Sequence, residues 1–204
     1  MTQTHTRQHF AEAYTGEAPW DIGRPQAPFL AVADHVKGPV LDSGCGTGDM
    51  ALHFAALGHQ VTAFDYLEEP IRRARAKAVE RGLTVDFRVA DALKLNEWPE
   101  RFNTVFDSGV FHVFSDEDRR RYVAGLTDVT NPGGRLFLMC FSNDEPGTAG
   151  PRRVTREELD AAFATGWQIE SVQPVQFEIN PKFTGNTFSA GGPRSWFAII
   201  RRET

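Results

Sequence analysis

Short apolar runs alternate with amphipathic segments along most of this 204-residue chain, and the alternation restricts the fold more than any other feature. Segments with apolar residues at helical spacing lie between several of these runs, and one of them has Pro70 in its first turn and Gly82 at its end. The pattern predicts an α/β fold with a doubly wound, mostly parallel sheet and helices on both faces. The first five strand-type runs occupy residues 39–44, 60–66, 84–91, 103–110 and 135–141.

Two further strand-type runs, 167–179 and 195–202, have no helix between them. They predict a hairpin, in which one strand runs antiparallel to the rest of the sheet. Residues 1–35 and the Phe/Gly-rich stretch 180–194 stand outside the alternation. We interpret residues 1–204 as a single domain, with a core over 38–202 and an N-terminal lid segment over 1–35.

Local signals predict where some elements begin. Thr155 followed three residues later by Glu158 indicates a capping box at a helix N-terminus. Ser115 or Asp116 is expected to cap the helix over 116–129. The sequence NPGG (131–134) predicts a turn before the fifth strand.

The stretch VLDSGCGTGDM (40–50) breaks an apolar run with three glycines, at positions 44, 46 and 48. Glycine inside an element costs conformational entropy, so three in five residues imply a close approach to the backbone. A strand, a glycine turn and a helix N-terminus together form a cradle for a ligand. We therefore expect a ligand to lie against Gly44 and Gly46, near the carboxylate of Asp42.

Two further acids indicate that this ligand is a nucleoside. Asp65 ends the second strand-type run, 21 residues after Gly44, where a carboxylate can bind a ribose diol. Asp91 ends the third, where a carboxylate can reach an adenine amino group. Both NAD and S-adenosylmethionine contain ribose and adenine. The G-x-G-x-G spacing and the carboxylate of Asp42, which would repel a pyrophosphate, favour S-adenosylmethionine.

These motifs, together with VADAL (89–93) and PGGRLF (132–137), resemble class I S-adenosylmethionine-dependent methyltransferases over residues 38–202. The segments APWDIGRPQ (18–26), DSGVFHVF (107–114) and GPRRVTREEL (150–159) are similar to small-molecule methyltransferases of the heterocyclic toxin and thiopurine type. The resemblance implies a Rossmann-like sheet of order 3-2-1-4-5-7-6 with strand seven antiparallel. It also implies methyl transfer to O, N or S of a small aromatic or heterocyclic molecule.

The resemblance further implies how the cofactor is held. Asp65 would bind the ribose hydroxyls, and Asp91 with Ala92 the adenine edge. Tyr66 either lies along the adenine face or packs at the strand end. The whole set that we expect to bind S-adenosylmethionine is Trp20, Asp42, Gly44, Cys45, Gly46, Asp65, Tyr66, Asp91, Ala92 and Ser108.

The reaction is expected in the crevice outside the ends of strands one and four, where the winding reverses. A base is needed there only if the methyl acceptor arrives protonated. His112 lies in the segment DSGVFHVF of the fourth strand, and the ordinary pKa of a histidine suits a general base. Alternatively, His112 lines a wall of the crevice or binds a backbone group. The residues that we expect to contact the acceptor are Phe10, Tyr14, Phe111, His112 and Arg152.

Aromatic residues outside the periodic segments predict a hydrophobic lid over a flat acceptor, although they could instead complete the core. They are Phe10, Tyr14, Trp20, Phe177, Phe183 and Phe188. Arg152 and Arg153 could meet an anionic acceptor or be solvated.

The composition indicates which classes of binding partner the protein can have. The net charge is −5 with no long basic stripe, which disfavours nucleic acid. No apolar stretch is long enough for a membrane span, and the polar N-terminus does not resemble a signal peptide. The two distant cysteines, Cys45 and Cys140, suit a reducing cytoplasm, and no ligand-spaced cluster suggests a metal. We expect a cytoplasmic monomer or homodimer that acts on a small molecule.

Four alternatives remain open from the sequence. The chain could be a thiol or halide methyltransferase, or a protein that binds S-adenosylmethionine without catalysis. It could methylate RNA or protein, although the acidic composition and the sequence DSGV (107–110) weigh against adenine N6 as the target. It could also be an NAD-dependent dehydrogenase, although little chain remains for a second domain.

Overall fold

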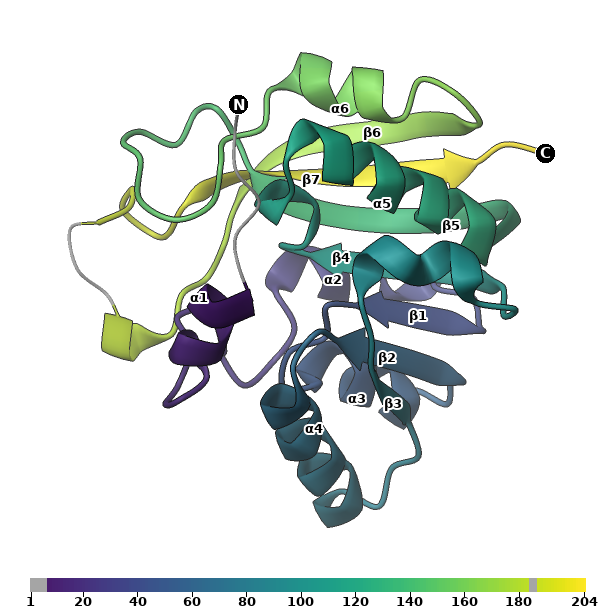
Figure 1. Cartoon of the computed structure of the whole chain (residues 1–204), viewed down its shortest axis with the longest axis vertical. Helices are drawn as coiled ribbons and strands as arrows, with labels where there is room; N and C mark the ends of the chain where they lie inside the picture. The colour runs from purple at the N-terminus through teal and green to yellow at the C-terminus, as the bar shows by residue number, and fades with distance from the viewer. Residues whose placement is uncertain (1–6, 184–186) are drawn as a thin grey trace.

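A seven-stranded sheet forms the centre of the computed structural model, which describes residues 7–183 and 187–204 (Figure 1). The strand order is β3-β2-β1-β4-β5-β7-β6, and Figure 1 shows it from β6 at the top to β3 at the bottom. Strand β7 is antiparallel to both β5 and β6, whereas the other pairs are parallel. The predicted order and the antiparallel final pair are therefore confirmed. The strands are β1 (Val40–Ser43), β2 (Val61–Asp65), β3 (Asp86–Val89), β4 (Phe102–Ser108), β5 (Thr130–Phe141), β6 (Trp167–Gln176) and β7 (Arg194–Arg202).

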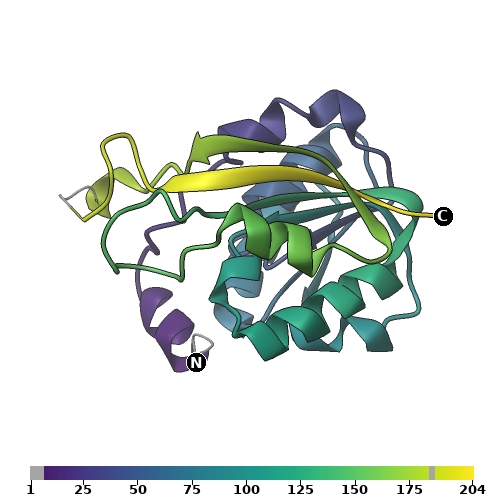
Figure 2. The same ribbon diagram turned by 90° about the horizontal axis from the view of Figure 1, so that it is seen from above.

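Helices cover both faces of the sheet, which Figure 2 shows between two helical layers. One layer contains α2 (Ala27–Leu30), α3 (Asp49–Ala56) and α4 (Glu68–Glu80). The other contains the 3₁₀ segment η2 (Ala92–Glu97), α5 (Asp116–Val129) and α6 (Arg156–Ala162). The remaining short elements are α1 (Arg7–Ala13), η1 (Ala33–His35), η3 (Phe111–Val113) and η4 (Pro181–Phe183). In the described part of the chain, no helix has the length and apolar character needed to cross a membrane.

The predicted helix caps are present. Ser115 is the residue that caps α5, and its Oγ accepts a hydrogen bond from the Asp118 amide at 3.1 Å. Thr155 and Glu158 form the reciprocal capping box of α6. These caps satisfy amide groups that have no partner within the first helical turn, so they define where each helix starts.

The turn expected at residues 131–134 is wrong, because these residues lie inside β5. Phe102 of β4 pairs with Thr130, and Thr104 pairs with Arg135, so two steps along β4 oppose five along β5. Gly133 has a φ of +78°, which a bulged strand can use as readily as a turn. Residues 131–134 therefore form an irregular bulge in β5, and β5 pairs with β4 on both sides of it.

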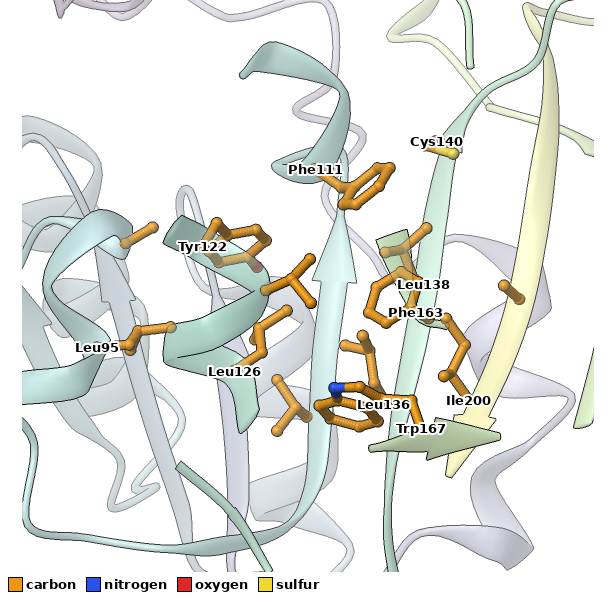
Figure 3. Close-up of a cluster of buried hydrophobic side chains, with 14 of the residues drawn as sticks. Leu95, Phe111, Tyr122, Leu126, Leu136, Leu138, Cys140, Phe163, Trp167 and Ile200 are labelled. Carbon is orange, nitrogen blue, oxygen red and sulfur yellow. The ribbon is translucent and has the colours of Figure 1, made fainter. Parts of the chain in front are cut away.

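Alternating side chains of β1 face opposite helical layers, and this alternation positions the site described below. Leu41 belongs to the core beneath α5, whereas Val40 belongs to the core beneath α3. Figure 3 shows the first of these cores, where Tyr122 of α5 and Leu138 of β5 lie among other buried apolar side chains. Polar side chains of β1 follow the same alternation, so neighbouring polar residues of this strand face opposite helical layers.

Candidate functional site

A cleft of about 600 Å³, open to solvent, lies outside the ends of β1 and β4, where the strand order reverses. The glycine loop after β1, the N-terminal segment before it, and the ends of β4 and β6 form its walls. The lining residues are Tyr14, Trp20, Asp21, Ile22, Arg24, Pro25, Gln26, Asp42, Gly44, Cys45, Gly46, Thr47, Asp49, Met50, Ser108 and Phe177.

Several expected site residues meet in this cleft, and others do not. Tyr14, Trp20, Asp42, Gly44, Cys45, Gly46 and Ser108 line it. Asp65 and Tyr66 at the end of β2, and Asp91 and Ala92 after β3, lie at the same edge of the sheet. Phe10, Phe111, His112 and Arg152 are not among its lining residues.

The glycine loop needs its glycines because of the protein's own packing. Gly44 and Gly46 have φ values of +69° and +53°, which other residues rarely adopt. A Cβ on Gly44 would lie 2.2 Å from Cγ2 of Val110, and one on Gly46 would lie 2.9 Å from the hydroxyl of Tyr14. On the sequence alone, these glycines are explained by a ligand that lies against the backbone. Contacts within the chain already exclude side chains here.

Tyr14 lines the cleft and packs against the glycine loop. Its side chain is buried, and its hydroxyl accepts a hydrogen bond from Nε1 of Trp20 at 2.9 Å. Arg73 of α4 donates hydrogen bonds to the carbonyl groups of Tyr14 and Gly16, each at 2.8 Å. The N-terminal segment is thereby attached to α4, and the Tyr14 hydroxyl lies beside Gly46 of the glycine loop.

The N-terminal segment is also joined to the chain that follows β6. The side chain of Gln26 exchanges two hydrogen bonds with the backbone of Glu178, at 2.8 and 3.0 Å. Arg24 forms an ion pair with the Glu178 carboxylate, and the Asn180 amide donates to the Pro19 carbonyl at 2.8 Å. The two segments outside the strand–helix alternation therefore contact each other at one side of the cleft.

Carboxylates give the cleft an acidic lining. Asp42 is buried and accepts a hydrogen bond from the Ala51 amide of α3 at 3.1 Å, and burial raises the pKa of its carboxyl to about 7. Asp65 accepts hydrogen bonds from the amides of Gly46 (3.0 Å) and Leu67 (3.1 Å), and burial raises its pKa as well. Asp91 accepts one from the Leu93 amide at 2.9 Å.

A cationic ligand fits these groups. Asp49 also lines the cleft, but its carboxylate already has two cationic partners: Oδ2 binds Lys77 at 2.8 Å, and the buried Oδ1 lies 3.6 Å from the Arg81 guanidinium. Asp21 and Asp42 line the same cleft. S-Adenosylmethionine carries a sulfonium and an ammonium group, and each favours a carboxylate neighbour. The donor set therefore suits that cofactor.

The end of β4 contains a buried acid that the sequence reasoning missed. Asp107 accepts hydrogen bonds from the amides of Val110 (2.7 Å) and Phe111 (3.0 Å) and from the hydroxyl of Tyr122 (3.0 Å). Burial raises the pKa of Asp107 to about 7. The position of Asp107 within an apolar strand-type run could have identified it from the sequence, because a buried carboxylate needs several hydrogen-bond donors.

Two residues expected to contact the acceptor lie elsewhere. Phe111 is fully buried in the core beneath α5, where it stacks with Phe163 at a centroid distance of 5.7 Å. Arg152 forms ion pairs with Asp116 and Glu158 of the adjacent helices. Phe111 is held in the core and Arg152 is held by these ion pairs, and neither lines the cleft. Phe10 contacts the ring of Trp20 edge-on at 6.0 Å.

His112 lies behind the cleft wall. Its ring is 5% exposed, and its Nδ1 accepts a hydrogen bond from the Phe141 amide at 2.9 Å. Phe141 meets it edge-on at 5.1 Å, and the cleft residue Phe177 lies 6.1 Å away. The described residues contain no group of three or more metal-binding side chains.

Comparisons with known proteins agree with this geometry. Residues 40–134 match a family model described as a methyltransferase domain. The chain is 33% identical over 208 aligned positions to 2-heptyl-1-hydroxyquinolin-4(1H)-one methyltransferase of Mycobacteroides abscessus, which covers 96% of this chain and 89% of that protein.

Two solved structures have a similar fold. One, from work on the conversion of a disulfide bond into a thioacetal group during echinomycin biosynthesis, has a TM-score of 0.83 and 35% identity, over 97% of this chain and 93% of its own. The other is 1,6-didemethyltoxoflavin-N1-methyltransferase of Burkholderia thailandensis with bound S-adenosylhomocysteine. Its TM-score is 0.72 at 24% identity, over 97% and 87% of the chains, which supports the fold alone.

The Rossmann-like strand order, the acidic cleft at the glycine loop and the full-length likeness to a methyltransferase lead to one conclusion. The chain belongs to the S-adenosylmethionine-dependent methyltransferase family, and S-adenosylmethionine is its cofactor.

Proposed function

We propose that this enzyme methylates an O, N or S atom of a small, planar heteroaromatic molecule. The observation that carries the proposal is the 33% identity to the hydroxyquinolone methyltransferase, which extends over 96% of this chain. The likeness therefore includes the N-terminal segment that lines the cleft, as well as the cofactor-binding sheet. Trp20 and Phe177 supply flat apolar walls there, which suit an aromatic acceptor.

The proposed cofactor contacts follow the edge of the sheet. Asp65 would hold the ribose hydroxyls, and Asp91 with Ala92 would hold the adenine edge. Asp42, Gly44, Cys45, Gly46 and Ser108 would surround the methionine part, with Trp20 and Tyr66 as aromatic neighbours.

For methyl transfer, the main task of the protein is to align the acceptor with the methyl group. When bound, the cofactor supplies a methyl group on a sulfonium, so transfer is an in-line displacement with a neutral leaving group. The residues of the cleft would orient the acceptor and exclude water, and both effects lower the barrier. The N-terminal segment is proposed as the lid, which its contacts with Glu178 and Asn180 support.

A turnover assay tests the function directly. The purified chain would be incubated with S-adenosylmethionine and a panel of hydroxyquinolones, phenols, thiols and halides, and S-adenosylhomocysteine would be measured. Turnover of the heteroaromatic members supports the proposal. Turnover restricted to thiols or halides contradicts it. No turnover with any member, despite cofactor binding, would instead indicate a non-catalytic binding protein.

A sulfur acceptor is the second candidate, because the 35% identical structure comes from work on disulfide-to-thioacetal conversion. We also propose a cytoplasmic monomer or homodimer, which the two free thiols, Cys45 and Cys140, support. Light scattering during gel filtration tests the oligomeric state.

A further inference from the structure

Glu145 lies in the chain that follows β5, and it is not one of the residues that line the cleft. The residue is 2% exposed, and burial of a carboxylate is unfavourable unless hydrogen-bond donors replace its water. The donors come from residues 189–194, which lead into β7 and which we call the connecting segment. The Ser189 amide donates to Oε1 at 3.0 Å, and the Arg194 amide donates to Oε2 at 2.8 Å. One buried carboxylate therefore holds the connecting segment at both of its ends.

The connecting segment in turn fixes the backbone around Phe177. The Phe177 amide donates a hydrogen bond to the Pro193 carbonyl at 3.0 Å. The side chain of Gln176 donates to the carbonyl groups of Ala190 (2.9 Å) and Gly192 (3.0 Å). At Gly192 the two segments are so close that an added Cβ would lie 1.9 Å from the Phe177 carbonyl oxygen. The position of the Phe177 backbone therefore depends on the connecting segment.

Phe177 connects this arrangement to the cleft. It is buried, it directly follows β6, and it lines the cleft. The backbone of the next residue, Glu178, exchanges two hydrogen bonds with the side chain of Gln26, which lines the cleft as well. Since the connecting segment contacts both the amide and the carbonyl of Phe177, a displacement of that segment would move this wall of the cleft.

We infer that Glu145 is a positioning residue for the methyl acceptor, because it fixes Phe177 through the connecting segment and so sets the position of the apolar wall. The inference rests on the proposed function, in which Trp20 and Phe177 are the walls for a planar acceptor. Binding of the acceptor then depends on a carboxylate outside the cleft. The cofactor contacts proposed at Asp65 and the glycine loop do not involve that carboxylate.

Glu145→Gln is the main test variant. A glutamine has one carbonyl oxygen and an NH₂ group, so it can accept from one of the two amides and presents a donor to the other. Gln176→Ala weakens the hold of the connecting segment from an exposed position, so a folded variant is expected. Glu170→Gln is the matched control. Glu170 binds Arg135 of β5 and Arg201 of β7 at the end of the sheet away from the cleft.

The variants and the wild type would be compared in the KM and kcat of a methylated heteroaromatic acceptor, and in the Kd of S-adenosylmethionine by calorimetry. Glu145→Gln should raise the acceptor KM by about 5- to 30-fold with kcat nearly unchanged, because a displaced wall weakens ground-state and transition-state contacts alike. Gln176→Ala should raise the acceptor KM in the same direction, and Glu170→Gln should not. The Kd of S-adenosylmethionine should stay within about twofold of the wild-type value in all three variants.

An unchanged acceptor KM in Glu145→Gln, or an equal loss of cofactor affinity, would overturn the inference. If Glu145→Gln does not fold, an unchanged acceptor KM in Gln176→Ala overturns it instead. A rise in acceptor KM in the Glu170→Gln control would show that general loss of stability, rather than the position of the wall, determines acceptor binding.

A double-mutant comparison tests whether Glu145 acts through Phe177. In a Phe177→Ala background, Glu145→Gln should change the acceptor KM by less than about twofold, because the wall on which it acts is already absent. An undiminished increase in that background would mean that Glu145 acts by another route, and the inference would fail.

Amide hydrogen exchange tests the link between Glu145 and Phe177 without turnover. The Phe177 amide should exchange at least about tenfold faster in Glu145→Gln than in the wild type, whereas the amides of β1 should keep their rates. Unchanged exchange at Phe177 contradicts the link. If the wild type methylates no panel member, the proposed function fails, while the exchange measurement still decides whether Glu145 holds Phe177.

Discussion

Tyr122 of α5 donates a hydrogen bond from its hydroxyl to Oδ2 of Asp107 at the end of β4, with 3.0 Å between the oxygens. The same hydroxyl lies 2.8 Å from Oγ of Ser43 on β1. Asp107 also binds the amides of Val110 and Phe111. The Asp107 carboxylate therefore joins β4 to α5, and the Tyr122 hydroxyl extends the contact to β1; the carboxylate also orients the chain that leads from β4 to His112.

Tyr122→Phe should destabilise the fold by about 1–3 kcal/mol, because it leaves buried polar groups of Asp107 and Ser43 with one partner fewer. Urea unfolding measures the change. Tyr66→Phe serves as the control: Tyr66 is 38% exposed, so its change should stay within about 0.5 kcal/mol. Equal effects of the two substitutions would contradict the structural role of the Tyr122 hydroxyl.

Gly44→Ala should destabilise the chain through both backbone strain and a clash. Its φ is +69°, and the added methyl group would lie 2.2 Å from Val110. Gly58→Ala is a matched control, because Gly58 has a φ of +89° and open space around its Cβ position. We expect a cost of roughly 1–2 kcal/mol at Gly58 and about 1–3 kcal/mol more at Gly44, measured by urea unfolding. Adding Val110→Ala should recover part of the extra cost, and no recovery would argue against the clash.

Asp65→Ala should weaken binding of S-adenosylmethionine by roughly 1.5–3 kcal/mol, since it removes charge-assisted hydrogen bonds to the ribose. Isothermal titration calorimetry measures the affinity. Asp86→Ala is the control, because Asp86 is an exposed acid on the neighbouring strand β3 that pairs with Arg88. Unchanged affinity in the folded Asp65 variant would sink the assignment of this carboxylate.

The stability should depend on the ionisation of Asp42. Burial raises the pKa of its carboxyl to about 7, above the ~3.9 of an unfolded aspartate. The native state then holds a proton that the unfolded chain releases, so this group's contribution to the unfolding free energy falls as pH rises from about 4 to 7. Asp42→Asn keeps an oxygen for the Ala51 amide and cannot ionise. Relative to wild type it should gain stability between pH 5 and pH 8, and a pH-independent difference in urea unfolding would refute the assignment.

Removal of residues 1–20 should leave a folded sheet but reduce turnover strongly. The deletion takes away Tyr14 and Trp20 from the cleft and opens the glycine loop to water. Circular dichroism with urea unfolding checks the fold, and the acceptor panel checks the activity. Full activity of the truncated chain would reject the N-terminal segment as a lid.

The strand order was implied by the resemblance to class I methyltransferases. The strands themselves, the glycine loop and the helix caps were accessible from the residues alone. They depend on local patterns: apolar runs of strand length, glycines after a strand, and Thr155 three residues before Glu158. Such patterns predict an element and its neighbours because each is determined by a few adjacent residues. The acids Asp42 and Asp65 were found for the same reason, since Asp42 comes just before the glycine loop and Asp65 ends β2.

Only the tertiary structure decided how side chains from distant segments meet. It brings the Tyr14 hydroxyl close to Gly46. It also pairs Arg152 with Asp116 and Glu158, and it forms the hydrogen bond from the Phe141 amide to Nδ1 of His112. The sequence determined that a histidine would stand near the end of β4. The partner of its Nδ1 is an amide 29 residues away, because β5 pairs alongside β4 and brings that amide into hydrogen-bonding distance.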